Sequence, residues 1–364
     1  MKIVIVGAGL AGPLLAQGLN RNGITVELYE REGTGRHSQG YRISIDPEGD
    51  LALRACLPPD RYERIHVTAG KRGTGVRFLD PQLRVVREML VPPTADEDVR
   101  GRHLTVDRLT LRKILLTGID VHHGASFQRF ELLDDGRVRT YFDNGTVTDA
   151  DLLVAADGTH SRIRAQWLPD AEVIETGQAE IYGKTALTDE IRTLTPDAAL
   201  DGFSVVAGDD GRFMSLAAHE FASGDGDDYV MWVVAAPTAL VPADLSAMDK
   251  PRLQKIAAEL IADWPENLTA LVRHADPESV QNTTIRTAKP LSPWETGPVT
   301  LMGDAIHTMI PAGSSAGTAL RDAALLCRRI TERTGSLRDA VHAYETEMLD
   351  YGFAMVERSL RSVT

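Results

Sequence analysis

The sequence predicts an α/β protein in which a parallel-sheet part is interrupted by a mostly antiparallel sheet and followed by C-terminal helices. Three observations predict this fold. Short apolar strands that lead into helices open the chain and recur after residues 150 and 297. Between these, residues 173–290 contain longer alternating runs, which are typical of antiparallel strands. At 364 residues, the chain has room for two domains.

The start of the chain predicts a strand–helix–strand unit. Residues 2–6 are apolar and β-branched, which favours a buried parallel strand, and residues 24–29 favour a second one. A glycine-rich turn and a helix over residues 13–21 connect the two strands. Pro13 is compatible with this helix, because a first-turn proline lacks only an N–H group that has no helical partner there.

The glycine-rich turn has the pattern G-x-G-x-x-G. Gly7 allows a tight turn, Gly9 allows a pyrophosphate to approach the main chain, and Gly12 allows the helix and strand to pack closely. The helix N-terminus would then present free N–H groups to the phosphates. Glu30, just after the second strand, is placed to accept hydrogen bonds from a ribose. This context favours Rossmann-like dinucleotide binding over a plain glycine-rich turn, and leaves NAD and FAD open.

Composition and charge exclude several classes of protein. The formal net charge of −13 argues against binding to nucleic acid or to an anionic membrane surface. No apolar run reaches the roughly 18 residues that a membrane span needs, and the short apolar start does not resemble a signal peptide, so we expect a cytoplasmic protein. Cys56 and Cys327 lie far apart without metal-ligand neighbours, so we expect free thiols and no metal site.

The chain next leaves the nucleotide-binding part. The sequence predicts a helix over residues 48–57 and strands over residues 41–45, 75–79, 83–87, 119–123 and 127–133, with a hairpin of 138–142 and 146–148. Asn144 and Gly145 form the predicted turn of that hairpin. Arg42 lies near the expected position of a cofactor's negative groups, with an exposed surface charge as an equal alternative.

Residues 104–117 predict an amphipathic helix with Asp107 as its N-cap. Arg108 would then lie in the first turn, where the helix dipole disfavours a cation. An anionic partner outside the helix would explain an arginine at this position.

Two later strands end in an acidic residue. One, over residues 152–156, stops at Asp157 and Gly158, and another, over residues 299–302, stops at Gly303 and Asp304. Strand ends at the carboxyl edge of an open α/β sheet face ligands, although an ordinary Asp-Gly turn remains the alternative for Asp157. The second strand is followed by a loop and by helices over residues 318–330 and 337–361; the loop contains Pro311, Gly313 and Gly317. Small residues before a helix provide N–H groups for an anionic group.

Residues 173–290 predict a mostly antiparallel sheet that is covered by one helix over residues 250–263. Aromatic and methionine side chains in these strands either line a pocket or form the packed face of the sheet: Tyr182, Phe203, Phe213, Met214, Met231 and Trp232. His219 stands alone in the sequence and is assigned no role.

Three motifs, in one order, carry a family resemblance. GAGLAG with Glu30, then DGTHSRIR, then MGDAIHTMIPAG resemble the flavoprotein aromatic hydroxylases, the para-hydroxybenzoate hydroxylase-like FAD monooxygenases. The resemblance covers nearly the whole chain and implies a GR2-type, Rossmann-like FAD-binding domain with an inserted substrate-binding domain. The implied FAD-binding domain comprises residues 1–70, 101–172 and 291–364, and the implied substrate-binding domain comprises residues 71–100 and 173–290.

The resemblance also implies cofactor contacts at matching positions. It assigns the FAD diphosphate to the first motif, that is Gly7, Ala8, Gly9, Leu10, Ala11 and Gly12. It assigns the adenosine end to Glu30 and Arg31, and the ribityl–diphosphate part to Arg108 and Asp304; Arg42 and Gly303 are further expected cofactor contacts. It assigns FAD support and NAD(P)H use to Asp157 and Gly158, and the isoalloxazine surroundings to Pro311, Gly313 and Gly317. No catalytic residue is singled out.

The implied activity is that of an FAD-dependent monooxygenase, a hydroxylase or epoxidase. NAD(P)H, as a transient reductant, would reduce the flavin, and O2 would form a flavin C4a-hydroperoxide. The oxygen would pass to an aromatic or polyketide-like small molecule held against the inserted sheet. NADH and NADPH both remain open as the reductant, as do a monomer and a homodimer.

One departure from the family keeps other functions open. After Pro311 the stretch GSSAGTALRDA is one residue shorter than in the family and lacks its Asn. A second hypothesis is therefore a flavoprotein in which FAD is structural and the reaction is a non-redox cyclisation or isomerisation. A third hypothesis is an FAD-binding module that acts as a partner or as a sequestering protein.

Overall fold

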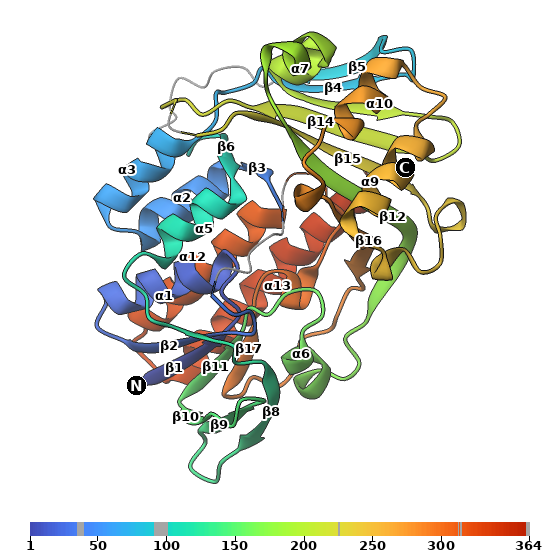
Figure 1. Ribbon diagram of the computed structural model, residues 1–364. Helices are drawn as coiled ribbons and strands as arrows, with labels where there is room; N and C mark the ends of the chain where they lie inside the picture. Colours follow the sequence, from blue (N-terminus) through green and yellow to red (C-terminus); the bar gives the residue numbers. More distant parts are fainter. Residues whose placement is uncertain (35–39, 91–100, 225, 312, 314, 362–364) are drawn as a thin grey trace.

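The computed structural model describes residues 1–34, 40–90, 101–224, 226–311, 313 and 315–361 (Figure 1). The last ten residues of the segment 71–100, which the sequence assigns to the substrate-binding domain, lie outside this described part. The structure confirms the predicted α/β fold, with a parallel sheet, a larger mixed sheet and long C-terminal helices. No helix within the described residues is both long and apolar enough to cross a membrane.

A five-stranded parallel sheet forms the centre of the first part. Its order is β17-β11-β1-β2-β7, and every pair of neighbours is parallel. The strands are β1 (Lys2–Val6), β2 (Thr25–Glu30), β7 (Val121–His123), β11 (Leu152–Ala155) and β17 (Val299–Leu301). Helices cover both faces, so β1 and β11 are apolar without alternation. The chain leaves β1 toward β2 on one side and returns to β11 on the other, which makes the β1–β11 boundary a switch point where such sheets bind ligands.

The helices of this part pack on the parallel sheet in one hydrophobic core. They are α1 (Ala11–Arg21), α2 (Pro47–Cys56), α3 (Pro59–Thr68), α5 (Arg108–Leu116), α6 (Arg162–Trp167), α11 (Asp304–His307), α12 (Ser315–Thr331) and α13 (Leu337–Arg361). Gly18 brings α1 against α2 and α12, because a Cβ there would lie 2.7 Å from the sulfur of Cys327 and 3.0 Å from that of Cys56. The two cysteines are free and buried, so they meet in this core although they are distant in sequence.

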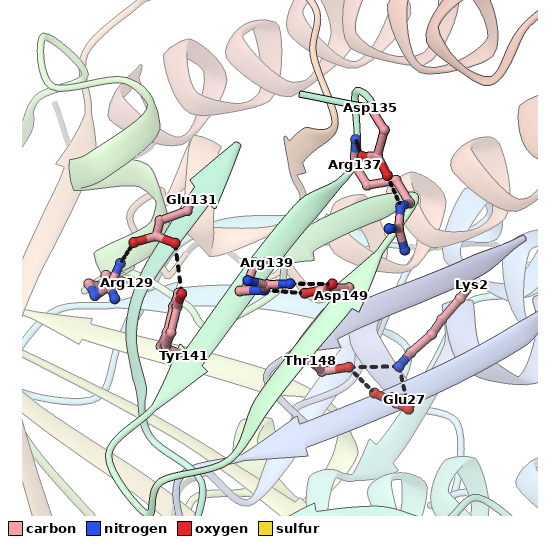
Figure 2. Close-up of polar contacts among 10 residues, drawn as sticks. All are labelled: Lys2, Glu27, Arg129, Glu131, Asp135, Arg137, Arg139, Tyr141, Thr148 and Asp149. Atoms are coloured by element: carbon pink, nitrogen blue, oxygen red, sulfur yellow. Dashed lines mark hydrogen bonds and ion pairs between the residues drawn. The ribbon is translucent and has the colours of Figure 1, made fainter. Parts of the chain in front are cut away.

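A three-stranded antiparallel sheet lies below the parallel sheet in Figure 1. It consists of β8 (Phe127–Leu132), β9 (Val138–Phe142) and β10 (Val147–Ala150), and the predicted hairpin is present. Its turn is not the type I′ turn that Asn144 and Gly145 favour, because φ is positive at Gly145 (+84°) but not at Asn144. Figure 2 shows how polar contacts hold it together and fasten it to the parallel sheet. Lys2 contacts both Thr148 and Glu27 at 2.7 Å, which ties β10 to β1 and β2. The guanidinium of Arg139 on β9 donates two hydrogen bonds to the carboxylate of Asp149 on β10, one to each oxygen.

A seven-stranded sheet forms the second part, above the first in Figure 1. Its order is β16-β12-β15-β14-β13-β4-β5, and only the β13–β4 pair is parallel. The strands are β4 (Gly75–Leu79), β5 (Val85–Leu90), β12 (Val173–Ala186), β13 (Phe203–Ala207), β14 (Phe213–His219), β15 (Tyr229–Pro237) and β16 (Gln281–Ala288). One face packs on helices α9 (Lys250–Leu260) and α10 (Glu266–Arg273), with Trp232 and Met214 in that core. The other face turns Tyr182, Phe203 and Met231 toward Tyr41 of the first part.

Two sequence predictions of secondary structure were wrong. Residues 104–107 are not helical: they form strand β6 (Leu104–Asp107), which pairs with β3 (Arg42–Ile45), and the helix begins only at Arg108. The alternation of this short run and its β-branched Thr105 and Val106 suit a strand.

The sheet is also covered by more than the one predicted helix. Beyond α9 and α10, the structure has the short helices α7 (Asp189–Leu194) and α8 (Asp197–Asp201) and the 3-10 turns η1 (Thr238–Leu240), η2 (Leu245–Ala247) and η3 (Pro277–Ser279). Pro265 stands at the N-cap of α10, which is why the helical pattern breaks after α9 and starts again.

Candidate cofactor and active site

A cavity of about 490 Å³ runs along the carboxyl edge of the parallel sheet. Residues at or just beyond the ends of its strands line it: Gly7 after β1, Glu30 as the last residue of β2, Asp157 after β11 and Asp304 beyond β17. Residues of β12 and β16 close it on the side of the seven-stranded sheet. The cavity therefore lies at the switch point and connects the two parts of the fold.

The three glycines of the first motif play different parts at this cavity. Gly7 has a φ of +110°, and a Cβ there would lie 2.1 Å from the carbonyl oxygen of Ala156. A Cβ on Gly12 would lie 2.1 Å from the carbonyl oxygen of Gly7. At Gly9, by contrast, the nearest atom would be Nη2 of Arg108 at 4.0 Å. The fold itself thus requires glycine at 7 and 12, whereas position 9 is open only toward the cavity, as a closely approaching diphosphate needs.

Glu30 is held at the edge of the cavity by main-chain groups. Its carboxylate accepts hydrogen bonds from the N–H of Ala8 and from that of Glu32, both at 2.9 Å. Arg31, next in the chain, is exposed and also lines the cavity. This arrangement fits the adenosine end of a dinucleotide, because a fixed carboxylate at the end of β2 accepts from ribose hydroxyls.

Helix α5 places two arginines against the cavity. Asp107 is its N-cap, as predicted, and accepts from the N–H of Thr110 at 2.8 Å. Burial lowers the pKa of the Arg108 guanidinium, and the nearby Asp304 carboxylate opposes that effect. Arg112, one turn further on, donates from Nε to the carbonyl oxygen of Ala8 at 2.5 Å. Arg112 was not predicted from the sequence, although its spacing of four from Arg108 puts both on one helix face.

The two acidic strand ends both face the cavity. Oδ1 of Asp157 is buried and has no hydrogen-bond partner among the described residues, and burial raises the pKa of this carboxyl. The Asp304 side chain is open to the cavity but surrounded by protein, and burial raises its pKa, against the effects of His307 and Arg108. Both are acceptors without enough donors from the chain, so hydroxyl groups of a bound cofactor fit beside them.

A buried network holds Asp304 in place. Asp322 of α12 accepts from the N–H of Gly303 at 2.6 Å, and its Oδ2 lies 2.7 Å from Nε2 of His307. Tyr351 of α13 donates its hydroxyl to the same carboxylate. The C-terminal helices therefore fix the turn that carries Asp304.

The structure brings most of the predicted cofactor contacts together. Ten of them line the cavity: Gly7, Ala8, Gly9, Glu30, Arg31, Arg108, Asp157, Gly158, Asp304 and Pro311. Six others are absent from its described wall: Leu10, Ala11, Gly12, Gly303, Gly313 and Gly317. Gly317 instead lets α12 approach α2, because a Cβ there would lie 2.2 Å from Oδ1 of Asp46.

Arg42 is not brought to the cavity. It is 9% exposed, its guanidinium lies 5.8 Å from the centre of the Phe203 ring, and Nη2 is 3.4 Å from the Thr105 hydroxyl. The pairing of β3 with β6 turns this side chain toward the seven-stranded sheet. Burial lowers its pKa to about 10.

The cavity also has walls that our sequence analysis did not predict. The described residues that complete it include Ser126, Thr159, His160, Arg162, Glu180, Thr283, Met309 and Ser315. Glu180 lies on β12 next to Ile181. Because neighbouring side chains of a strand point to opposite faces, an apolar Ile181 on the core face could have predicted Glu180 on the face toward the cavity.

Comparison with known proteins agrees with this geometry. A family model described as an FAD binding domain matches residues 104–359, more than half of the chain. The dual O-methyltransferase/FAD-dependent monooxygenase elcB of Phaeosphaeria nodorum is 30% identical over 90% of this chain, which spans only 40% of that protein's length. The FAD-dependent monooxygenase thnD of Trichoderma harzianum is 28% identical, with 99% of this chain and 92% of that protein covered.

Solved structures show the same fold. A structure described as an FAD-containing monooxygenase from Photorhabdus luminescens superposes with a TM-score of 0.86 at 30% identity, covering 100% of this chain and 97% of that one. The family match, the relatives and the fold agree with the cavity at the carboxyl edge of the sheet. The chain therefore belongs to the family of FAD-dependent monooxygenases that carry this FAD-binding domain.

Proposed function

We propose that the protein uses bound FAD, NAD(P)H and O2 to hydroxylate or epoxidise an aromatic or polyketide-like small molecule. The observation that carries this proposal is the cavity that joins Gly9 and Glu30 of the dinucleotide turn to Glu180 and Thr283 of the seven-stranded sheet. A dinucleotide held at Glu30 by its adenosine end would extend along the carboxyl edge and present its redox ring to that sheet.

In this proposal the chain binds, orients and excludes water, and FAD, when bound and reduced, supplies the activation of O2. Arg108 balances the charge of the diphosphate, Asp304 accepts hydrogen bonds from the ribityl hydroxyls, and Pro311 lies beside the ring. Residues 1–70, 101–172 and 291–364 hold the cofactor, and residues 71–100 and 173–290 hold the substrate.

The test begins with the purified protein. We expect a yellow protein with bound FAD that oxidises NADH or NADPH faster when a suitable hydroxylated aromatic compound is added under air. With 18O2, the product should carry one labelled oxygen atom. Flavin that is reduced and reoxidised without any labelled product from a broad set of aromatic compounds would contradict the proposal.

The same assay separates the other hypotheses. Conversion of a compound without consumption of NAD(P)H would support a structural FAD in a cyclisation or isomerisation. The loop that suggested this alternative includes residues 312 and 314, which lie outside the described residues. Tightly bound FAD with no turnover of any kind would support a sequestering role.

A further inference from the structure

Glu180 is a buried acid at the place where the cavity meets the seven-stranded sheet. It lies in the middle of β12, paired with Ala235 on one side and Thr283 on the other. Its neighbour Ile181 points into the core under α9 and α10, so Glu180 points the opposite way, toward the FAD-binding part. It lines the same cavity as Arg108, Asp304 and Pro311, and only 7% of the residue is exposed.

Burial alone raises the pKa of the Glu180 carboxyl, and neither a hydrogen bond nor a charge from another described residue contributes to the shift. Two other buried carboxylates are satisfied by the protein: Asp107 accepts from Thr110 and Tyr229, and Glu345 accepts from Thr296 and Thr300. A buried polar group without a partner lowers stability, so proteins satisfy nearly all of them. An unsatisfied acid that faces a cavity is therefore positioned for a ligand.

Small and aromatic side chains neighbour Glu180 on its face of the sheet. The residues next to it across the sheet are Ala235 on β15 and then Phe213 on β14. Ala235 is small, Phe213 is partly exposed, and Tyr182 lies two residues further along β12 on the same face. Small and aromatic side chains around one polar group are typical of a site that binds an aromatic ligand.

We propose that Glu180 binds the substrate by accepting a hydrogen bond from a phenol-type hydroxyl on its aromatic ring. This inference rests on the proposed function and names its substrate class, a hydroxylated aromatic compound. In its ionised form Glu180 also takes the proton: the substrate O–H bond breaks, the proton moves to a carboxylate oxygen, and the electron pair stays on the substrate oxygen. The ring that is to be oxygenated thereby becomes richer in electrons.

Glu180 is assigned to the substrate and not to the cofactor because of where it comes from. The proposed FAD contacts Glu30, Arg108 and Asp304 belong to the carboxyl edge of the parallel sheet, whereas Glu180 belongs to the sheet opposite. Loss of its charge should therefore leave FAD affinity and the spectrum of substrate-free flavin unchanged.

The protonation state of Glu180 sets a pH dependence. Burial raises the pKa of this carboxyl to about 7. Tyr182 lies beside it, and the other charged and titratable groups that line the cavity are Glu30, Arg31, Glu32, Arg108, Arg112, Asp157, His160, Arg162, Arg286 and Asp304. We expect affinity for a phenol to rise as the pH increases through about 7, because only the carboxylate is a strong acceptor.

The experiment is a binding titration of the FAD-loaded protein without NAD(P)H, followed through the change in flavin absorbance. The probes are 1,3-dihydroxynaphthalene and its dimethyl ether, which differ in their ability to donate. At pH 8 the unaltered protein should prefer the diol by about tenfold or more, the size expected for a hydrogen bond to a charged acceptor. Glu180→Gln should abolish most of this preference and its pH dependence. The control Glu172→Gln removes an exposed carboxylate that pairs with Lys289, and should change neither.

Three results would overturn the inference. The first is a Glu180→Gln variant that still prefers the diol as strongly as the original protein does. The second is an original protein that binds both probes equally or binds neither, and the third is a Glu180→Gln variant with a changed FAD affinity or flavin spectrum. None of these depends on turnover. A protein that retains FAD and forms labelled product but shows one of them would refute the role of Glu180 alone. A protein that binds the diol through Glu180 but never oxygenates a compound would refute the proposed function alone.

Discussion

Tyr229 of the seven-stranded sheet donates a 2.9 Å hydrogen bond from its hydroxyl to Oδ2 of Asp107 in the FAD-binding part. The other oxygen of Asp107 caps helix α5, whose first residue is Arg108. Both partners are buried. One carboxylate thus links the position of the sheet to the position of an arginine at the cofactor cavity.

Replacing Tyr229 by Phe should lower the free energy of unfolding by about 1.5–3 kcal/mol, because it removes a buried hydrogen bond to a charged group. Urea unfolding of the FAD-free protein measures this change. The matched control is Tyr141→Phe, which removes a hydroxyl that donates to Glu131 at the surface and should have little effect. Equal effects of the two variants would show that the Tyr229–Asp107 contact is not a stabilising link.

Alanine at Gly12 should lower the stability of the protein, whereas alanine at Gly9 should weaken FAD binding. Gly12→Ala introduces a Cβ that collides with the main chain of Gly7, so we expect the FAD-free protein to lose at least about 1–3 kcal/mol of stability. Gly9→Ala meets no such obstacle and should leave that stability unchanged, but weaken FAD binding by about tenfold or more. Urea unfolding and flavin fluorescence titration measure the two quantities. If Gly9→Ala binds FAD with normal affinity, the diphosphate does not lie against Gly9.

Asp304→Ala should weaken the retention of FAD, because the side chain that would accept from the ribityl hydroxyls is removed. The bound flavin after gel filtration, measured by absorbance, checks this. Asp209→Ala, in the exposed loop between β13 and β14, is the control and should keep its flavin. Undiminished flavin in a folded Asp304→Ala variant would remove Asp304 from the site.

Glu180→Gln should stabilise the FAD-free protein, and more at high pH than at low pH. The pKa of Glu180 is raised by burial from its ordinary 4.5 to about 7, so the folded state favours the neutral acid. Stability from this group is fully present below pH 4.5 and is lost as the pH rises through 7, at about 1.4 kcal/mol per pH unit. At pH 8 the glutamine variant should therefore be more stable by about 3 kcal/mol, and at pH 5 by less than about 1 kcal/mol. Urea unfolding at both pH values tests this; an equal gain at both would mean that Glu180 does not titrate as described.

The sequence predicted those parts of the site that depend on neighbours along the chain. The turn of Gly7 and Gly12, the cap at Asp107 and the first-turn position of Arg108 follow from local geometry, and the structure has all of them. Glu180 was missed, because its surroundings depend on pairing with Ala235 and Thr283, far away in the sequence.

Pairing between distant strands also explains the other differences. Arg42 was expected near the cofactor from its position in the chain, but the β3–β6 pair turns it toward Phe203. His219 was assigned no role; it is buried, its ring stacks on that of Tyr229, and burial lowers its pKa to about 4, so it is a neutral packing group near pH 7.

The close packing of Gly18 against Cys56 and Cys327 makes the two thiols reporters of local opening. Both thiols are buried where helices α1, α2 and α12 pack together. A thiol reagent therefore cannot reach them while the three helices stay packed. Labelling of the two thiols then proceeds only when α1, α2 and α12 separate. The speed of that labelling, with and without FAD, measures how often the nucleotide-binding part opens and how firmly the cofactor keeps it shut.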